Sequence, residues 1–193
     1  MPAGSTDDTA IMIPAQVEGV DYQGQAACYF QRVMPKIPAP RAYLDGLDPA
    51  DPATGAHYAA MLGAEIIAQG PDTVLAFIQE PIGGASTGPL VPPQGDMQAV
   101  RDISTRYGVL MIHDEVMCGG GRTGVFLGAD HWGVAPDIIA LSKGFGAGYA
   151  PLGAMIAHDR IVNPVLDQGG FAHGFTYAGN PLPRPPRRAR RWD

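Results

Sequence analysis

Two continuous apolar runs of strand length, with a helix-patterned segment between them, constrain the fold of this chain most strongly. The runs are "TVLAFIQ" at residues 73–79 and "VLMIHDEV" at residues 109–116. Between them, apolar side chains recur at helical spacing from Met97 and Val100 onward, and Gly108 is a typical helix end. Strands buried on both faces read as continuous apolar runs, and strands separated by helices usually pair in parallel. We therefore predict an α/β fold, with a mostly parallel sheet and flanking helices.

Further elements extend this pattern on both sides. Asp51 followed by Pro52 is typical of a helix start, and Gly70 marks the end of the helix that the following residues predict. Two shorter runs, "DIIAL" at residues 137–141 and "PLGAMIAH" at residues 151–158, predict a third and a fourth strand.

Composition narrows the classes of function. The 193 residues, 46% of them hydrophobic, can bury one substantial core, and the net charge of -6 argues against nucleic acid or an anionic membrane as a partner. The first residues resemble no secretory signal, and no stretch approaches the roughly 18 apolar residues of a membrane span. Cys28 and Cys118 are the only cysteines, which predicts no disulfide framework. We expect a cytoplasmic protein that binds small molecules or other protein chains.

The last eleven residues, "PRPPRRARRWD" at 183–193, differ from the rest of the chain. They hold five of the eleven arginines, and their prolines prevent a helix. Arg, Pro and Ala are what a GC-rich gene encodes when it is read in the wrong frame. We expect a frameshifted or truncated end rather than a basic arm for nucleic acid.

Three functional side chains follow three successive predicted strands. Glu80 ends the first strand, Asp114 lies near the end of the second, and Lys143, one of only two lysines, follows the third. Because ligands of open α/β sheets bind at the carboxyl ends of the strands, we expect two carboxylates and an amine at one edge.

The alternation of a strand separates the side chains around Asp114 into two faces. It puts Leu110, Ile112, Asp114 and Val116 on one face and His113 and Glu115 on the other. A carboxylate in line with Leu and Ile is expected to face a buried layer and to need a cationic partner there. Glu115 is expected to have a structural role, at a strand end paired with Arg122.

Pyridoxal 5′-phosphate (PLP) is the cofactor that uses both a lysine amine and a facing carboxylate. The amine forms a Schiff base with it, and the carboxylate keeps the pyridine nitrogen protonated. At these residues the chain resembles the class III PLP-dependent aminotransferases, the ω-aminotransferase group of fold type I. The motifs that carry the resemblance are "FIQEPIGGASTG" (77–88), "GVLMIHDEVMCGGGRTGVFLGADHWGVAPDIIALSKG" (108–144), "GYAPLGAMI" (148–156) and "HGFTYAGNPL" (173–182).

The resemblance implies roles for five residues. Lys143 forms the Schiff base, Asp114 pairs with the pyridine nitrogen, and Val116 packs on the ring face. Glu80 lies in the substrate region, and Thr176 reaches the phosphate of the partner subunit's cofactor, which implies a homodimer. The implied reaction transfers an amino group from a primary amine or ω-amino acid to a 2-oxo acid such as pyruvate.

The resemblance also implies an incomplete fold type I large domain. Its parts are an irregular N-terminal region at residues 1–50, a PLP-binding core at 51–182 and the aberrant tail at 183–193. Members of the family carry a phosphate-binding loop, a ring-stacking aromatic residue and a C-terminal domain, none of which is recognisable in this sequence. We expect the chain by itself to catalyse transamination slowly or not at all.

Individual positions depart from the family's pattern as well. Ala178 and Asn180 stand where the family commonly has Ser and His, and Met117 replaces a polar residue of some members.

Other residues of the sequence suggest two alternative functions and a metal site. "GGGRTG" at residues 119–124 fits the G-x-G-x-x-G pattern of an NAD-dependent oxidoreductase, but no amphipathic helix opens after it. A non-catalytic PLP-binding fragment is the other alternative. The spacing of His113, Cys118, Asp130 and His131 matches no zinc pattern, so we predict no metal site.

Overall fold

The computed structural model describes residues 10–14, 34–84 and 88–170. Outside the described residues lie Thr176, Ala178, Asn180, the 183–193 tail and Cys28.

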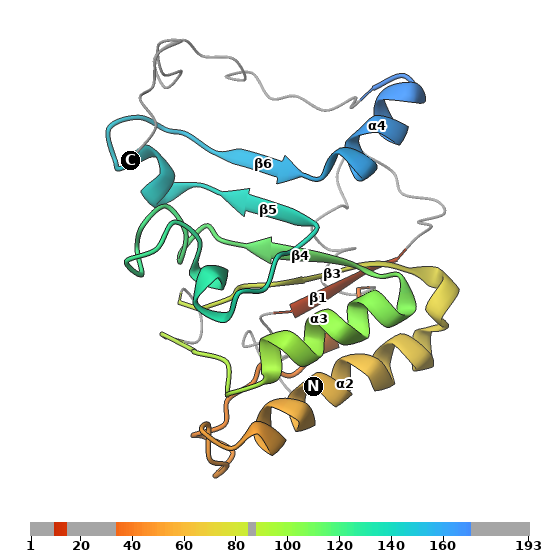
Figure 1. The fold of residues 1–193 in the computed structure, drawn as a ribbon, viewed down its shortest axis with the longest axis vertical. Coiled ribbons are helices and arrows are strands. Elements are labelled where there is room, and N and C mark those ends of the chain that lie inside the picture. Colours follow the sequence, from red (N-terminus) through yellow and green to blue (C-terminus); the bar gives the residue numbers. More distant parts are fainter. Residues whose placement is uncertain (1–9, 15–33, 85–87, 171–193) are drawn as a thin grey trace, which may run out of the picture.

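Six strands form one sheet in the order β2-β1-β3-β4-β5-β6 (Figure 1). In chain order they are β1 Ala10–Pro14, β2 Lys36–Ile37, β3 Val74–Gln79, β4 Leu110–Asp114, β5 Ile138–Leu141 and β6 Ala154–Ala157. The helices are α2 Pro52–Gln69, α3 Asp96–Tyr107 and α4 Asp159–Asp167. The described part of the chain also contains three short 3-10 turns, at Pro71–Thr73, Gly128–Trp132 and Lys143–Gly146.

The predicted ends of α2 and α3 are confirmed. An oxygen of the Asp51 side chain accepts a hydrogen bond from the N–H of Ala53 at 2.9 Å, and α2 stops before Gly70, whose φ is +89°. Gly108 ends α3 in the left-handed conformation, and its N–H donates to carbonyls of the last turn. The strand expected from Thr73 begins one residue later, because residues 71–73 form a 3-10 turn.

The sheet is mixed, and its central strands are parallel as predicted. β3, β4 and β5 pair in parallel, and β1 and β6 run antiparallel to their neighbours, so four of the six strands share one direction. β6 is antiparallel because the segment between β5 and β6 contains only the 3-10 turn Lys143–Gly146, with no crossover helix to return the chain.

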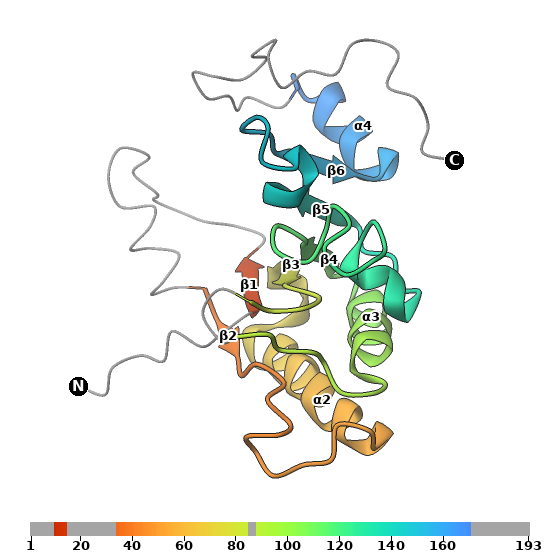
Figure 2. The same ribbon diagram turned by 90° about the vertical axis from the view of Figure 1, so that its left-hand side faces the viewer.

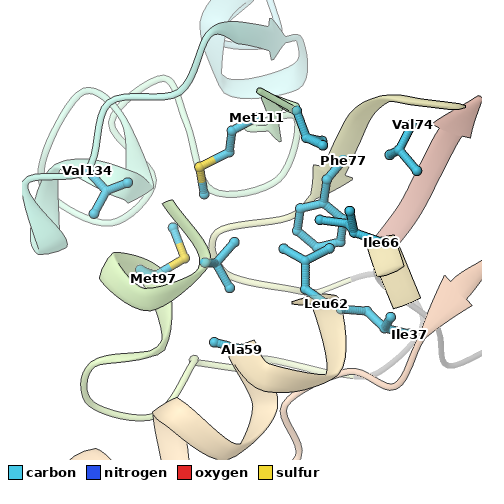
Figure 3. Packing of buried hydrophobic residues seen from close by; sticks show 11 residues of the cluster. Ile37, Ala59, Leu62, Ile66, Val74, Phe77, Met97, Met111 and Val134 are labelled. Carbon is cyan, nitrogen blue, oxygen red and sulfur yellow. The ribbon is translucent and has the colours of Figure 1, made fainter. Parts of the chain in front are cut away.

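Helices α2 and α3 lie side by side on one face of the sheet (Figures 1 and 2). The core fills the space between them and β3 and β4 (Figure 3). Its buried members are Ile37, Ala59, Leu62, Ile66, Val74, Phe77, Met97, Val100, Val109, Met111 and Val134. Among the described residues, no helix is both long and apolar enough to cross a membrane.

The helices decide which face of β4 is buried. Met111 and His113 are fully buried, whereas Ile112 and Asp114 on the other face are half-buried. Asp114, which is expected to face a buried layer, is only half-buried in the described part of the chain, because α2 and α3 pack on the opposite face.

Candidate active site

Glu80, Asp114 and Lys143 lie at the carboxyl edge of the three parallel strands. Glu80 directly follows β3, Asp114 ends β4, and Lys143 begins the turn after β5. The pKa of the Glu80 carboxyl is raised, first by burial and then by the negative charge of Asp114, while the charge of Lys143 acts in the opposite direction. The carboxyl group of Glu80 thus interacts electrostatically with both Asp114 and Lys143, so the fold brings the three predicted side chains together.

Glu80 is only partly satisfied by the protein. The backbone N–H of Gly84 donates to its carboxyl group, yet Oε2 is buried and has no hydrogen-bond partner in the described part of the chain. A buried oxygen without a partner is costly unless another group reaches it. Glu80 is therefore suited to receive a donor from a bound molecule.

Asp114 and Val116 form a local turn at the end of β4. The N–H of Val116 donates to Oδ1 of Asp114 at 3.0 Å, and this is the one hydrogen bond to that carboxylate among the described residues. The bond orients the carboxylate and leaves Oδ2 free to accept a proton donor. The cationic partner expected for Asp114 is not found as an ion pair, because the ion pairs of the described residues both belong to Asp137.

Lys143 lies beside an open groove of about 620 Å³. Its side chain is exposed, its φ is +42°, and its Nζ contacts Sδ of Met117 at 2.7 Å. A positive φ is uncommon for a residue other than glycine, and such strained residues cluster at functional sites. The groove is lined by Gly120, Gly121, Arg122, Lys143, Gly144, Ala147 and Gly148.

The glycines of the 119–124 segment make room for the turn that carries Lys143. A Cβ atom added to Gly120 would lie 2.6 Å from both the carbonyl carbon of Gly144 and the nitrogen of Phe145. No α-helix opens after this segment; the next element is the 3-10 turn Gly128–Trp132. The geometry of a dinucleotide-binding loop, with a helix N-terminus at the pyrophosphate, is therefore absent from these described residues.

Glu115 has a structural role, but its predicted partner Arg122 is wrong. The carboxylate of Glu115 is fully buried, while Arg122 is exposed. Its oxygens accept the N–H of Gly128 at 2.8 Å, the N–H of Ala129 at 2.9 Å and the thiol of Cys118 at 2.9 Å. Burial and the bond to Glu115 raise the pKa of the Cys118 thiol to about 12, so this cysteine is a protonated structural group.

Sequence reasoning missed the contact between Met117 and Lys143. The sequence shows Met117 only as a departure from the family's pattern. Met117 and Lys143 are 26 residues apart, and no local pattern indicates that the thioether contacts the amine. Within the described ranges, no group of three His, Cys, Asp or Glu side chains is placed to hold a metal ion.

Several known proteins are similar to this chain in both sequence and fold. The sequence model of the family described as aminotransferase class-III matches residues 27–184. The putrescine–pyruvate aminotransferase of Pseudomonas aeruginosa is 41% identical over an alignment of 172 residues, and the match covers 86% of this chain and 37% of the relative. The diaminobutyrate–2-oxoglutarate transaminase of Halomonas elongata is 46% identical over an alignment of 132 residues, and the match covers 65% of this chain and 28% of the relative.

Solved structures agree with these relatives. A thermostable (S)-enantioselective ω-transaminase from Thermomicrobium roseum matches 84% of this chain and 39% of its own, with a TM-score of 0.70 and 36% identity. The ω-transaminase from Pseudomonas jessenii, solved in complex with PMP, matches 76% of this chain and 33% of its own, with a TM-score of 0.68 and 34% identity. The chain thus spans 28 to 39% of the length of these four proteins. The family model matches 158 residues of the chain, and the solved structures have a similar fold. The chain therefore belongs to the class III aminotransferases.

Proposed function

We propose that the protein of which this chain forms the Lys143 region is a PLP-dependent aminotransferase. It transfers an amino group from a primary amine or ω-amino acid to a 2-oxo acid such as pyruvate, and it works as a cytoplasmic homodimer. The observation that carries the proposal is the position of Glu80, Asp114 and Lys143 at the carboxyl ends of three adjacent parallel strands, where the charges of Asp114 and Lys143 both act on the Glu80 carboxyl. The similarity to a putrescine–pyruvate aminotransferase supports this choice of substrates.

The described residues fit the cofactor. Lys143 would supply the amine, the carboxylate of Asp114 would pair with the pyridine nitrogen, and Val116 would pack on the ring. When bound, PLP supplies a protonated ring that draws electrons from the substrate carbon. We assign Glu80 to the substrate region, because its unpaired oxygen can accept a donor there. Thr176, which lies outside the described residues, would reach the phosphate held by the partner subunit.

Each side chain then has a task of its own. The amine of Lys143 would hold the cofactor through its aldehyde and, once released from it, would move a proton at the substrate carbon. Asp114, oriented by the N–H of Val116, would keep the ring nitrogen of the cofactor protonated. We assign the cofactor-binding core to residues 51–182, a range that lies wholly within the residues 27–184 matched by the family model.

Borohydride reduction in the presence of PLP tests the assignment of Lys143. After reduction and peptide mapping, the pyridoxyl group is expected on Lys143 and not on Lys36, the other lysine of the sequence. Lys143→Ala should abolish the label, while Lys36→Ala should retain it. Labelling of Lys36 alone, or NAD binding without a PLP spectrum, would contradict the proposal.

A further inference from the structure

Met117 contacts both Lys143 and the loop that follows β3. Its Sδ accepts a hydrogen bond from Nζ of Lys143 at 2.7 Å. At its other end, Cε would lie 3.2 Å from a Cβ atom added to Gly84, so the methyl group already rests against that glycine. Met117 is half-buried, and both contacts restrict where its thioether can lie.

Lys143 needs such a contact because little else restrains it. Its side chain is exposed and has many rotamers, so ordering it costs conformational entropy. Glu80 and Asp114 are close enough for all three charges to interact, yet the structure records no ion pair between Lys143 and either carboxylate. The recorded partner of the amine is instead an uncharged sulfur atom.

We propose that Met117 is a positioning residue for Lys143, which holds the amine beside the glycine-lined groove and away from the two carboxylates. A carboxylate partner would stabilise the protonated amine, which cannot attack an aldehyde. A thioether is a weak acceptor without charge, so it orients the amine without placing a negative charge beside it. The inference rests on the proposed function, since orientation of this amine matters where it reacts with a cofactor.

Competitive labelling of the two lysines tests this role without PLP. The full chain is treated with limiting formaldehyde and a borohydride, and mass spectrometry gives the ratio of methylation at Lys143 to that at Lys36. Lys36 is exposed on β2 and serves as an internal reference. Because the readout needs no cofactor, it can support the role of Met117 even where PLP labelling fails, and the two hypotheses fail independently.

Met117→Leu keeps the volume and removes the acceptor, so it separates positioning from packing. We expect the Lys143-to-Lys36 ratio at neutral pH to fall about three- to tenfold, the range that one net hydrogen bond corresponds to. Met117→Gln, a neutral acceptor, should restore most of the ratio. Met117→Glu should move half-maximal labelling of Lys143 to higher pH, because the new carboxylate pairs with the ammonium.

Gly84→Ala displaces the methionine without changing it. Its new Cβ atom pushes on Cε of Met117, so we expect a smaller fall of the ratio in the same direction. This variant also answers the question if Met117→Leu does not fold, which circular dichroism would reveal. An unchanged ratio in the folded Leu and Ala variants, or equal losses in the Leu and Gln variants, would overturn the positioning role.

Discussion

His113 is a fully buried histidine without a hydrogen bond. Neither ring nitrogen has a partner in the described part of the chain. Burial, and then the positive charge of Arg101, lower its pKa to about 4, although the charge of Asp137 acts against this. Glu115, two residues later and equally buried, accepts three hydrogen bonds instead. The fold therefore accepts His113 only as a neutral side chain.

Protonation of His113 should make stability depend on pH. An unfolded chain binds a proton at this residue near pH 6.5, and the folded chain near pH 4, so the free energy of unfolding falls as pH falls through that interval. Over the whole interval the loss is about 3 kcal/mol. Urea unfolding of His113→Met between pH 7 and pH 4.5 should lack this part of the pH dependence. His57→Gln, at an exposed histidine, should keep it, and a wild-type profile in His113→Met would refute the argument.

Helix α2 contains two glycines with different surroundings. A Cβ atom at Gly55 would lie 2.2 Å from the carbonyl oxygen of Gln94 and 2.5 Å from the nitrogen of Asp96. A Cβ atom at Gly63 would meet only the side chain of Ile103, at 3.8 Å, an ordinary contact. The first glycine thus allows α2 to approach the start of α3 backbone to backbone, and the second does not.

Alanine at these two positions should therefore have opposite effects. Gly55→Ala forces the backbone of α2 away from the backbone at the start of α3. It should destabilise the fold by about 1–3 kcal/mol, the usual cost of overpacking. Gly63→Ala is the matched control in the same helix, and it should be neutral or stabilise by up to about 1 kcal/mol, because alanine favours helix. Chemical denaturation measures both. Equal effects of the two substitutions would show that the close approach of α2 to α3 does not contribute to the free energy of unfolding.

Asp137 joins parts of the molecule that are far apart in the sequence. It accepts the N–H of Met111 at 2.7 Å and a guanidinium N–H of Arg101 at 2.9 Å, and it also pairs with Arg160. Arg101 belongs to α3, Met111 to β4 and Arg160 to α4. Burial alone would raise the pKa of Asp137, but the Met111 bond and the two arginines outweigh it and lower the pKa. The carboxylate thus stays charged and connects both helices to the sheet.

Removal of this charge should weaken the whole domain. Asp137→Asn keeps an acceptor for Met111 and loses both ion pairs, and we expect a destabilisation of about 2 kcal/mol in urea. Asp159→Asn, at an exposed acid of α4, should change stability by less than about 0.5 kcal/mol. Because the folded pKa of Asp137 is lowered, its stabilisation is present above the unfolded pKa near 4 and disappears as pH falls further. A variant as stable as wild type at pH 7 would disprove the role of this carboxylate.

Much of this protein could be predicted from local sequence. Asp51 and Gly108 mark helix ends, because caps depend on residues within one turn. The order of apolar runs predicted the parallel centre of the sheet, and parallel strands bring the residues after them to one edge. Glu80, Asp114 and Lys143 could for that reason be grouped before any coordinates were known.

Other features were decided by the tertiary structure alone. The buried face of β4 depends on where α2 and α3 pack, so Asp114 is half-buried and His113 fully buried. Glu115 bonds to the N–H groups of a turn 13 and 14 residues away, and Lys143 contacts Met117 across 26 residues. Alternation along a strand determines which side chains share a face, but it carries no information about what covers that face. Partners that come from distant segments are set only when packing brings those segments together.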